Sequence, residues 1–477
     1  MNDIKELFLR SDTDDTVFDT PAYKTAQGEI TYGKLLSDIE YCGDLISRQG
    51  AAPVLVFCSK TIEAYTAVLA CLYAGRAYIP IEPGMPSERL RRIIRSSKCS
   101  LAIGEGIKTD GNIFGIECVG LGELKRYRRR RPKQFEGDTA YIIYTSGSTG
   151  EPKGVPISRD NLLNFINWIN RIDGADELRK AKIRVLDQAS FSFDLSVADI
   201  YFAFSNRLTL VAAPKETMNT EAVLETVRAE RIGMLTVTPT FLKLCMTDPH
   251  FAAGGFPALR CAFLCGERLE TEVARKMLSR FPDCRLINAY GPTEATCAVS
   301  AVPITEDMLS KELLPVGRTD TSAVSVSIED EEIVLRGKSV FAGYIGGNEG
   351  GFFTENGINC FRTGDIGYTE DGYIYCCGRK DSQVKYKGYR IELGDIENNL
   401  LSIRGVTDCA VVAKYRGGCV GYIKAFVKLE EGLTAEKVRL SLSEKLPLYM
   451  IPKVVEEIDS IPVNANGKTD RRRLAEL

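Results

Sequence analysis

The sequence is nearly without histidine: one residue, His250, stands among 477. It lies in a loop-like segment at residues 247–250, where a lone histidine is more often structural than catalytic, so we expect a surface or capping role. Any mechanism that needs a histidine base would have to use this residue. Serine-triad chemistry and histidine-rich metal sites are therefore disfavoured.

Long apolar runs are absent as well. No stretch reaches the roughly 18 apolar residues of a membrane span, and residues 1–15 carry acidic side chains without the apolar core of a secretory signal. The fifteen cysteines show neither zinc-ligand spacing nor a disulfide framework, the adjacent Cys376 and Cys377 included. We expect a cytoplasmic protein with reduced, mostly buried cysteines and no membrane span.

An excess of charge of either sign is also missing. Charged residues make up 26% of the chain, and the formal net charge is −3. The basic run at residues 125–131 is the one local exception. Because it is short, precedes Pro132 and stands in a slightly acidic chain, we interpret it as a solvated linker and expect no nucleic-acid partner.

What the sequence does have is a regular alternation of strand-like and helix-like segments, which is typical of α/β units with parallel sheet. The alternation runs through residues 52–105 and starts again near Arg184, so we expect two stacked α/β halves. The first half has segments at 52–59, 61–75, 77–81, 87–97 and 101–105, and the second at 185–190, 195–204, 207–213, 220–232 and 234–240.

The pattern changes at Glu332 to short, glycine-bounded alternating strands, which predict a small antiparallel, β-barrel-like part. The last hundred or so residues mix helix-like segments (394–403, 435–446) with strand-like ones (409–415, 422–429), as in a small α+β domain. We therefore predict a large N-terminal domain at 1–378, a hinge at 379–381 and a small, mobile C-terminal domain at 382–477.

The strongest local motif is the glycine- and hydroxyl-rich loop at residues 144–154, which follows an apolar strand and contains Lys153. Glycines let backbone N–H groups converge on phosphate oxygens, and hydroxyls and a lysine add donors and charge. A Walker A loop needs Ser or Thr directly after its lysine, and Gly154 stands there instead. The loop is thus predicted to bind phosphate in another way.

This loop resembles that of the adenylate-forming superfamily of acyl-CoA synthetases, luciferases and adenylation domains. The resemblance covers nearly the whole chain and continues in order through further motifs, at residues 74–80, 193–196, 288–294, 361–365, 378–397, 446–452 and 466–471. It implies ATP and Mg²⁺ as cofactors. By resemblance the ATP-binding residues are Thr145, Ser146, Gly147, Ser148, Thr149, Gly150, Lys153, Asn288, Ala289, Tyr290, Gly291, Thr293, Asp365 and Arg379.

The residue types suit the roles that the resemblance implies. Tyr290 offers a flat face for adenine, and Glu294 offers a hard oxygen ligand for Mg²⁺. The two oxygens of Asp365 match the vicinal hydroxyls of ribose.

Two residues near the C-terminal domain carry the implied catalytic cycle. Lys468 would lie between the substrate carboxylate and the α-phosphate, and Asp381 would be the hinge about which the small domain turns for a second reaction with a thiol. In that second state the segment at 385–388 would close over the thiol. The chain ends shortly after Lys468, so we expect the thiol to come from a separate phosphopantetheinylated carrier protein, and we expect a monomer.

Asp194 distinguishes amino-acid activators from fatty-acyl and aryl enzymes, because a carboxylate in an apolar pocket requires a cation such as an α-ammonium. Within this class the likeness is greatest to D-alanine:D-alanyl carrier protein ligases. It implies a substrate pocket with Phe193, Asp194, Cys265, Gly291 and Cys297, in which Cys265 lies next to the substrate Cα.

Two departures from that family keep alternatives open: Cys297 replaces a small aliphatic residue, and the segment at 322–337 is short. The first leaves the side chain of the substrate open. Three alternatives remain. The protein could be a free-standing peptide-synthetase-type enzyme that activates another small amino acid, an acyl-CoA ligase, or a non-catalytic descendant of the fold.

Overall fold

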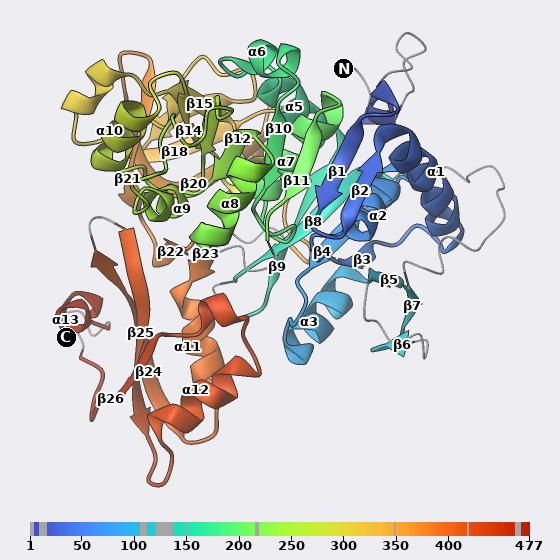
Figure 1. Cartoon of the computed structure of the whole chain (residues 1–477). Helices are drawn as coiled ribbons and strands as arrows, with labels where there is room; N and C mark the ends of the chain where they lie inside the picture. The colour runs from blue at the N-terminus through green and yellow to red at the C-terminus, as the bar shows by residue number, and fades with distance from the viewer. Residues whose placement is uncertain are drawn as a thin grey trace. The chain divides into compact units, whose positions relative to one another are not determined.

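The computed structural model describes residues 4–8, 17–104, 112–120, 137–147, 150–214, 219–347, 350–416, 419–462 and 469–477 (Figure 1). Ser148, Thr149, Lys468 and the basic run at 125–131 lie outside these residues. None of the described helices is long and apolar enough to cross a membrane.

The chain divides into two units. The first comprises residues 1–83, 97–143 and 155–378, and the second comprises 84–96, 144–154 and 379–477. The second unit thus contains the loop at residues 144–154, called the phosphate-type loop below because it is predicted to bind phosphate. It also contains most of the helix at residues 87–97 and the C-terminal part of the chain.

Two mostly parallel sheets dominate the first unit, as the alternation of segments predicts. In the larger sheet, β1 and β10 to β14 run parallel, while β2 and β15 pair antiparallel at its ends. In spatial order its strands are β15 (Ser300–Pro303), β14 (Arg285–Tyr290), β13 (Cys261–Leu264), β12 (Ile232–Val237), β10 (Arg184–Asp187), β11 (Thr209–Ala212), β1 (Pro21–Thr25) and β2 (Gly28–Thr31).

The strands of the other parallel sheet are, in spatial order, β6 (Asn112–Ile113), β7 (Ile116–Gly120), β5 (Leu101–Gly104), β3 (Val54–Phe57), β4 (Tyr78–Ile81), β8 (Thr139–Thr145) and β9 (Lys153–Ser158). Helices of the N-terminal three quarters are α1 (Tyr32–Arg48), α2 (Ile62–Tyr73), α3 (Ser87–Ser97), α5 (Arg159–Ile169), α6 (Ala175–Lys180), α7 (Leu195–Ser205), α8 (Thr220–Ala229), α9 (Pro239–Cys245) and α10 (Thr271–Arg280). Single 3-10 turns are η1 (Ile4–Phe8), η3 (Thr293–Ala295) and η4 (Glu306–Ser310).

Helices α2 and α7 are apolar on nearly every side, and residues 64–72 and 195–204 are all buried. Such helices belong inside a core rather than on its surface. They share one hydrophobic cluster with Val56 of β3 and Val185 of β10, one strand from each parallel sheet. The main core therefore joins the two sheets, which confirms the expectation of two packed α/β halves.

The predicted antiparallel part takes the form of a third sheet in the first unit (Figure 1). Its strands are β16 (Gly317–Arg318), β17 (Ser325–Glu329), β18 (Glu332–Arg336), β19 (Phe352–Glu355), β20 (Ile358–Glu370) and β21 (Tyr373–Arg379). The short segment noted in the sequence is the hairpin of β17 and β18, which turns at Asp330 and Glu331, both with positive φ.

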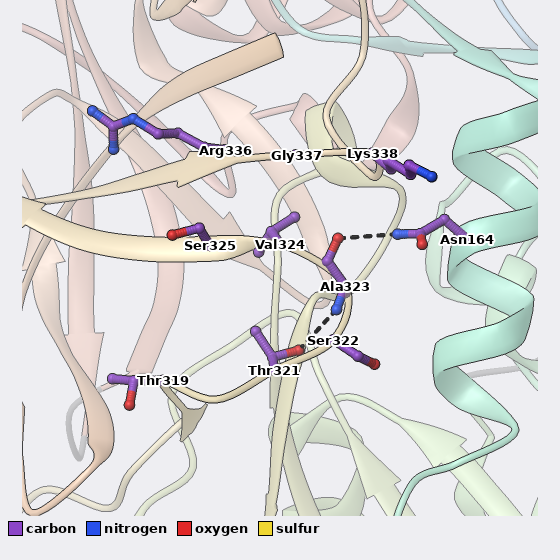
Figure 2. Close-up of a pocket in the computed structure, with 10 residues that line it drawn as sticks. All are labelled: Asn164, Thr319, Thr321, Ser322, Ala323, Val324, Ser325, Arg336, Gly337 and Lys338. Atoms are coloured by element: carbon purple, nitrogen blue, oxygen red, sulfur yellow. Dashed lines mark hydrogen bonds between the residues drawn. The ribbon is translucent and has the colours of Figure 1, made fainter. Parts of the chain in front are cut away.

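The open end of this hairpin borders a pocket of about 430 Å³ (Figure 2). Asn164 of α5 closes one side of it by donating to the Ala323 carbonyl at 3.0 Å, and the Thr321 hydroxyl accepts from the N–H of Ala323 at 3.3 Å. The pocket is lined by Asn164, Thr319, Thr321, Ser322, Ala323, Val324, Ser325, Arg336, Gly337 and Lys338. None of these residues is among those expected to bind ATP or the amino acid.

The C-terminal part of the second unit has the expected α+β composition. It contains the hairpin β22 (Gln383–Tyr386) and β23 (Tyr389–Glu392), the sheet β24 (Val406–Arg416), β25 (Cys419–Leu429) and β26 (Val454–Glu457), the helices α11 (Leu393–Leu401), α12 (Ala435–Ser443) and α13 (Arg471–Glu476), and the turn η5 (Leu448–Met450). Its core contains Ile396 and Leu400 of α11 and Val438 and Leu442 of α12.

Two expectations about single residues hold. His250 is exposed, and its backbone N–H donates to the Asp248 carboxylate at 2.8 Å, so it has the surface role predicted for it. The described cysteines are mostly buried thiols, although Cys376 is half-buried and Cys377 exposed.

Candidate active site

Tyr290 and Asp365, both expected at the nucleotide, are bonded to each other. Tyr290 is the last residue of β14, and its hydroxyl donates to Asp365 Oδ2 at 2.6 Å. Both side chains are almost fully buried. Burial, followed by the charge of Asp365, holds the pKa of Tyr290 well above its usual value, so the hydroxyl stays a donor. The structure therefore brings these two residues, 75 positions apart in sequence, into one polar site.

The motif at residues 288–294 is closely packed at the end of β14 and in the turn that follows it. A Cβ on Gly291 would lie 2.6 Å from the Cα of Ala298, so only glycine fits there. Asn288 anchors the strand by donating to the Pro315 carbonyl at 2.7 Å, and Ala289 is buried beside it. This turn aims Thr293 and Glu294 at different partners.

Glu294 is completely buried, and it accepts a hydrogen bond from the Tyr344 hydroxyl at 2.5 Å. Its backbone carbonyl also accepts from the N–H of Phe341 at 2.8 Å. The carboxylate is thus held in one orientation. Tyr344 was missed by sequence reasoning, because it lies 50 residues from Glu294 and nothing in the local sequence links the two.

Asp194 stands at the N-terminal end of α7 with 8% of its surface exposed. Its side chain makes no capping hydrogen bond to the helix, so a role as helix cap does not explain this carboxylate. Instead Asp194 Oδ2 accepts from the Thr293 hydroxyl at 2.6 Å. The two residues expected at substrate and nucleotide, respectively, are therefore in direct contact.

The two cysteines expected at the amino acid lie next to each other. Cys265 follows β13, and its Sγ lies 4.0 Å from the carbonyl oxygen of Cys297; both side chains are buried. Burial, then the negative charge of Asp194, then Cys265 raise the pKa of Cys297 well above its usual value. The ring of Phe193 lies 3.6 Å from where a Cβ on Gly266 would stand, next to Cys265. All the residues predicted to bind the amino acid thus come together in the first unit.

Thr296 and Cys297 both have positive φ, at 62° and 72°. Non-glycine residues rarely adopt this conformation, and two in succession mark a locally strained backbone. The strain falls where Cys297 meets Cys265. The departure seen in the sequence at Cys297 therefore lies next to Cys265, the residue expected beside the substrate Cα.

In the second unit, the phosphate-type loop runs between Thr145 at the end of β8 and Lys153 at the start of β9. A Cβ on Gly147 would lie 2.1 Å from the carbonyl oxygen of Glu151, and Gly150 has a φ of +81°. Both glycines are thus required by the tight path of the loop. That the loop presents backbone N–H groups to phosphate stays a prediction.

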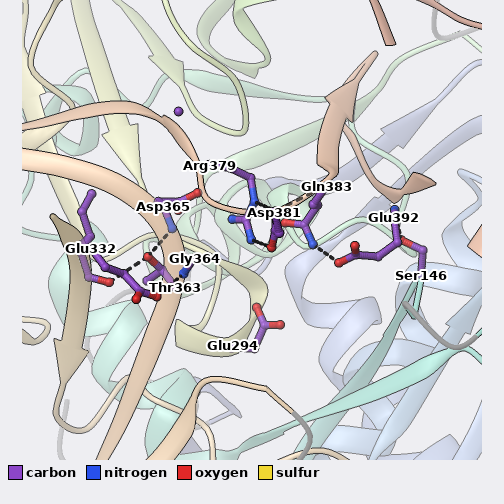
Figure 3. A network of polar contacts seen from close by, with 12 residues as sticks. Ser146, Glu294, Glu332, Thr363, Gly364, Asp365, Arg379, Asp381, Gln383 and Glu392 are labelled. Atoms are coloured by element: carbon purple, nitrogen blue, oxygen red, sulfur yellow. Dashed lines mark hydrogen bonds and ion pairs between the residues drawn. The ribbon is translucent and has the colours of Figure 1, made fainter. Parts of the chain in front are cut away.

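Ser146 ties this loop to the C-terminal part of the same unit. Its hydroxyl donates to the Arg390 carbonyl at 3.1 Å and accepts from the N–H of Glu392 at 2.8 Å. Figure 3 shows Ser146 next to Glu392. In the same unit, Arg89 of α3 lies 3.5 Å from the buried carboxylate of Asp395 in α11. Sequence reasoning missed Arg89 and Asp395, since an ion pair between segments so far apart leaves no local pattern.

Arg379 and Asp381, predicted at the ribose and at the hinge, form a bidentate ion pair with distances of 2.7 and 2.6 Å (Figure 3). Asp381 also accepts from the N–H of Gln383 at 3.1 Å. Burial alone would raise the pKa of Asp381, but the hydrogen bonds and charge of Arg379 outweigh it and hold the pKa below its usual value. The hinge role of Asp381 stays a prediction, as do the roles of Ser148, Thr149 and Lys468, which lie outside the described residues.

Comparisons with known proteins show which family the chain belongs to. Residues 10–345 match the family model described as AMP-binding enzyme, and residues 395–468 match the model of the AMP-binding enzyme C-terminal domain. The class of protein is thus an AMP-forming ligase that uses ATP. The chain belongs to the AMP-binding enzyme family.

The chain also resembles curated proteins over nearly its full length. The chain is 37% identical to a D-alanine–D-alanyl carrier protein ligase of Bacillus licheniformis, over 96% of both chains, and 35% identical to one of Listeria welshimeri, again over 96% of both. Among solved structures, an adenylation domain of Vibrio cholerae in complex with glycyl-adenosine-5'-phosphate matches with a TM-score of 0.81 at 23% identity, over 96% of this chain and 94% of that one. The o-succinylbenzoate CoA synthetase of Bacillus subtilis matches with a TM-score of 0.83 at 19% identity, over 96% and 95%. These two structures support the fold alone.

Proposed function

We propose that this enzyme activates D-alanine with ATP, releasing pyrophosphate, and transfers the D-alanyl group to the phosphopantetheine thiol of a separate carrier protein. The observation that carries the proposal is the buried Asp194 carboxylate, which accepts a hydrogen bond from Thr293. The near-full-length relatives named as D-alanine–D-alanyl carrier protein ligases support the same choice.

Asp194 supplies the reason for an amino-acid substrate. A carboxylate almost removed from water is stabilised by a nearby positive charge, and the α-ammonium of an amino acid would provide one. The Thr293 hydroxyl, bonded to Oδ2, would help to hold the carboxylate toward that ammonium. Cys265 and Cys297, both buried, would leave room for a methyl side chain rather than a large one.

The first half-reaction requires positioning rather than a general base. A carboxylate oxygen of the amino acid attacks the α-phosphorus of ATP, and the bond to the bridging oxygen breaks, so that pyrophosphate leaves with the electron pair. Tyr290 would stack on adenine and Asp365 would accept from the ribose hydroxyls. The loop from Thr145 to Lys153 would donate to phosphate oxygens, and Lys468 would offset the charge that builds up at the α-phosphate.

Glu294 is the residue whose chemistry fits Mg²⁺. The described residues contain no group of three or more His, Cys, Asp or Glu side chains that could hold a metal ion by themselves. Mg²⁺ is usually bound by one or two carboxylates together with substrate phosphates, and the oriented carboxylate of Glu294 can serve as one such ligand. A bound Mg²⁺ would neutralise charge on the phosphates.

In the second half-reaction the carrier thiol sulfur attacks the carbonyl carbon of D-alanyl-AMP. The bond from that carbon to the phosphate oxygen breaks, AMP leaves, and the thiol proton passes to solvent. A rotation of the C-terminal domain about Asp381 between the two steps would remove Lys468 and bring the segment at 385–388 to the thiol.

The test is pyrophosphate exchange by the purified full-length enzyme with D-alanine, L-alanine, glycine, L-serine and D-serine, each in the presence of Mg²⁺. We expect D-alanine to give the highest kcat/KM. A stronger exchange with another small amino acid would overturn the choice of D-alanine and favour a peptide-synthetase-type enzyme. Exchange with fatty or aryl acids and a CoA-dependent product would instead establish an acyl-CoA ligase.

A further inference from the structure

We propose that Glu332 is a positioning residue for the nucleotide site: its carboxylate fixes the bulge in β20 that presents Asp365 to the ribose. The inference rests on the ribose role proposed for Asp365 and adds to it a residue that supports the backbone rather than touching the substrate.

The first observation is the register between β18 and β20. Glu332 pairs with Ile366, and Val334 pairs with Arg362. Between these pairs β18 has the single residue Ile333, whereas β20 has residues 363–365. The extra residues form a β-bulge, which takes Asp365 out of the regular ladder and redirects its side chain.

A bulge leaves backbone N–H groups without their ladder partners, and buried donors must be satisfied in another way. The N–H of Gly364 donates to Glu332 Oε1 at 2.7 Å, and that of Asp365 donates to the Thr363 hydroxyl at 3.0 Å (Figure 3). The Thr363 hydroxyl in turn donates to the Ile333 carbonyl at 2.8 Å. Side chains thus replace the missing ladder.

The conformation of the bulge makes the Glu332 contact necessary. Gly364 has a φ of +74°, in the left-handed region, so the turn is not held by ordinary strand geometry. Glu332 is 9% exposed, and Thr363 and Asp365 are less exposed still. Because these residues are buried, water would not readily replace the Glu332 carboxylate as acceptor for the N–H of Gly364. Losing the carboxylate would therefore leave a buried donor unsatisfied. The Tyr290 hydroxyl, at 2.6 Å from Asp365, completes the hold on the carboxylate from the other side.

The experiment measures pyrophosphate exchange with ATP and with 2′-deoxy-ATP for Glu332→Ala, Glu332→Asp and Glu332→Gln. Alanine removes the acceptor, and aspartate keeps the charge but withdraws the oxygens by one methylene. Both should reduce the preference for ATP over 2′-deoxy-ATP by about tenfold, mainly through the KM for ATP, while the KM for the amino acid stays unchanged. Glutamine retains an acceptor oxygen and should restore most of the preference.

Glu329→Ala is the matched control. Glu329 pairs directly with Glu332 across the same hairpin and carries the same charge, and both carboxylates contact Arg362. Glu329 also bonds to Arg336, but it does not bond to the N–H of Gly364. Its loss should leave the nucleotide preference as in the wild type.

Asp365→Asn separates this inference from the proposed function. If that variant keeps the wild-type preference for ATP, the ribose role of Asp365 is wrong. If it loses the preference whereas Glu332→Ala and Glu332→Asp keep it, the positioning role of Glu332 is refuted and the ribose role stands. An equal loss of activity with both nucleotides, at an unchanged ratio, would likewise refute positioning and leave Glu332 as a residue needed only for stability.

Discussion

Asp194 is the residue on which the substrate class depends, and its environment makes the consequence of neutralising it specific. The Thr293 hydroxyl could still donate to the amide oxygen of an Asp194→Asn variant, so the local structure should survive. The attraction for an α-ammonium would be lost, at about 1.5–3 kcal/mol for a charge-assisted hydrogen bond. We expect the KM for the amino acid to rise roughly ten- to hundredfold, with the KM for ATP unchanged. Unchanged amino-acid affinity in exchange assays would show that Asp194 serves the fold alone.

Cys265 should help set the chirality of the substrate. With ammonium and carboxylate fixed, exchanging D- for L-alanine moves the methyl group toward one wall of the pocket. If Cys265 forms that wall, the L-form is rejected by a clash. Cys265→Ala should then gain activity on L-alanine disproportionately, by about 1–3 kcal/mol in the D/L ratio of kcat/KM.

Cys261→Ala is the matched control for this prediction, since Cys261 is a fully buried thiol at the start of the same strand, β13. It should leave the D/L ratio unaltered. A ratio that does not move in Cys265→Ala either would identify Cys265 as core packing.

At the scale of elements, α7 carries a second aspartate whose burial has a consequence for stability. Asp199 is fully buried, and neither of its oxygens makes a hydrogen bond of normal geometry with a described residue. Burial raises the pKa of Asp199 well above its usual value; the neighbouring Thr236 offsets part of this, and the charge of Asp187 adds to it. Asp199 therefore keeps its proton to a higher pH in the folded protein than in the unfolded chain.

The sign of the resulting pH dependence follows from that difference. The contribution of Asp199 to the free energy of unfolding is fully present below the usual aspartate pKa of about 3.9 and is lost as the pH rises toward the raised value. Asp199→Asn should flatten the fall of the Tm as the pH rises above about 3.9. The exposed Asp176→Asn is the control and should retain the wild-type slope. Parallel curves for wild type and Asp199→Asn would contradict the assignment.

The same scale shows what the sequence could and could not predict. The positions of β3, α2 and β4 could be predicted from hydrophobic periodicity, because the apolar residues of each element pack against elements that are close in the chain. The bulge in β20 depends on its partner β18, and the ion pair of Arg89 with Asp395 joins distant segments. Such features arise from tertiary pairing, so the motifs pointed to Glu294 and Asp365 as candidates but not to Tyr344 and Glu332, which contact them or their backbone.

At the scale of the whole molecule, the order of motifs predicted the family and the fold, because several short patterns in a fixed order are far more specific than any one of them. It did not predict that residues 84–96 and 144–154 group with residues 379–477 in the second unit. This grouping depends on contacts such as that of Ser146 with Glu392, which only the folded chain reveals.

The proposed domain rotation makes the two half-reactions separable in a Lys468→Ala variant. The lysine would act only in the adenylating state, where its positive charge would stabilise the negative charge that builds up at the α-phosphate during attack. Adenylate formation, measured as pyrophosphate exchange, should therefore be abolished. Transfer from chemically prepared D-alanyl-AMP to the carrier thiol should proceed at close to the wild-type rate, because the lysine would have left the site by then. Lys437→Ala, at an exposed position of α12, should affect neither step. Equal loss of both half-reactions in Lys468→Ala would mean that the lysine serves a single, unrotated active site.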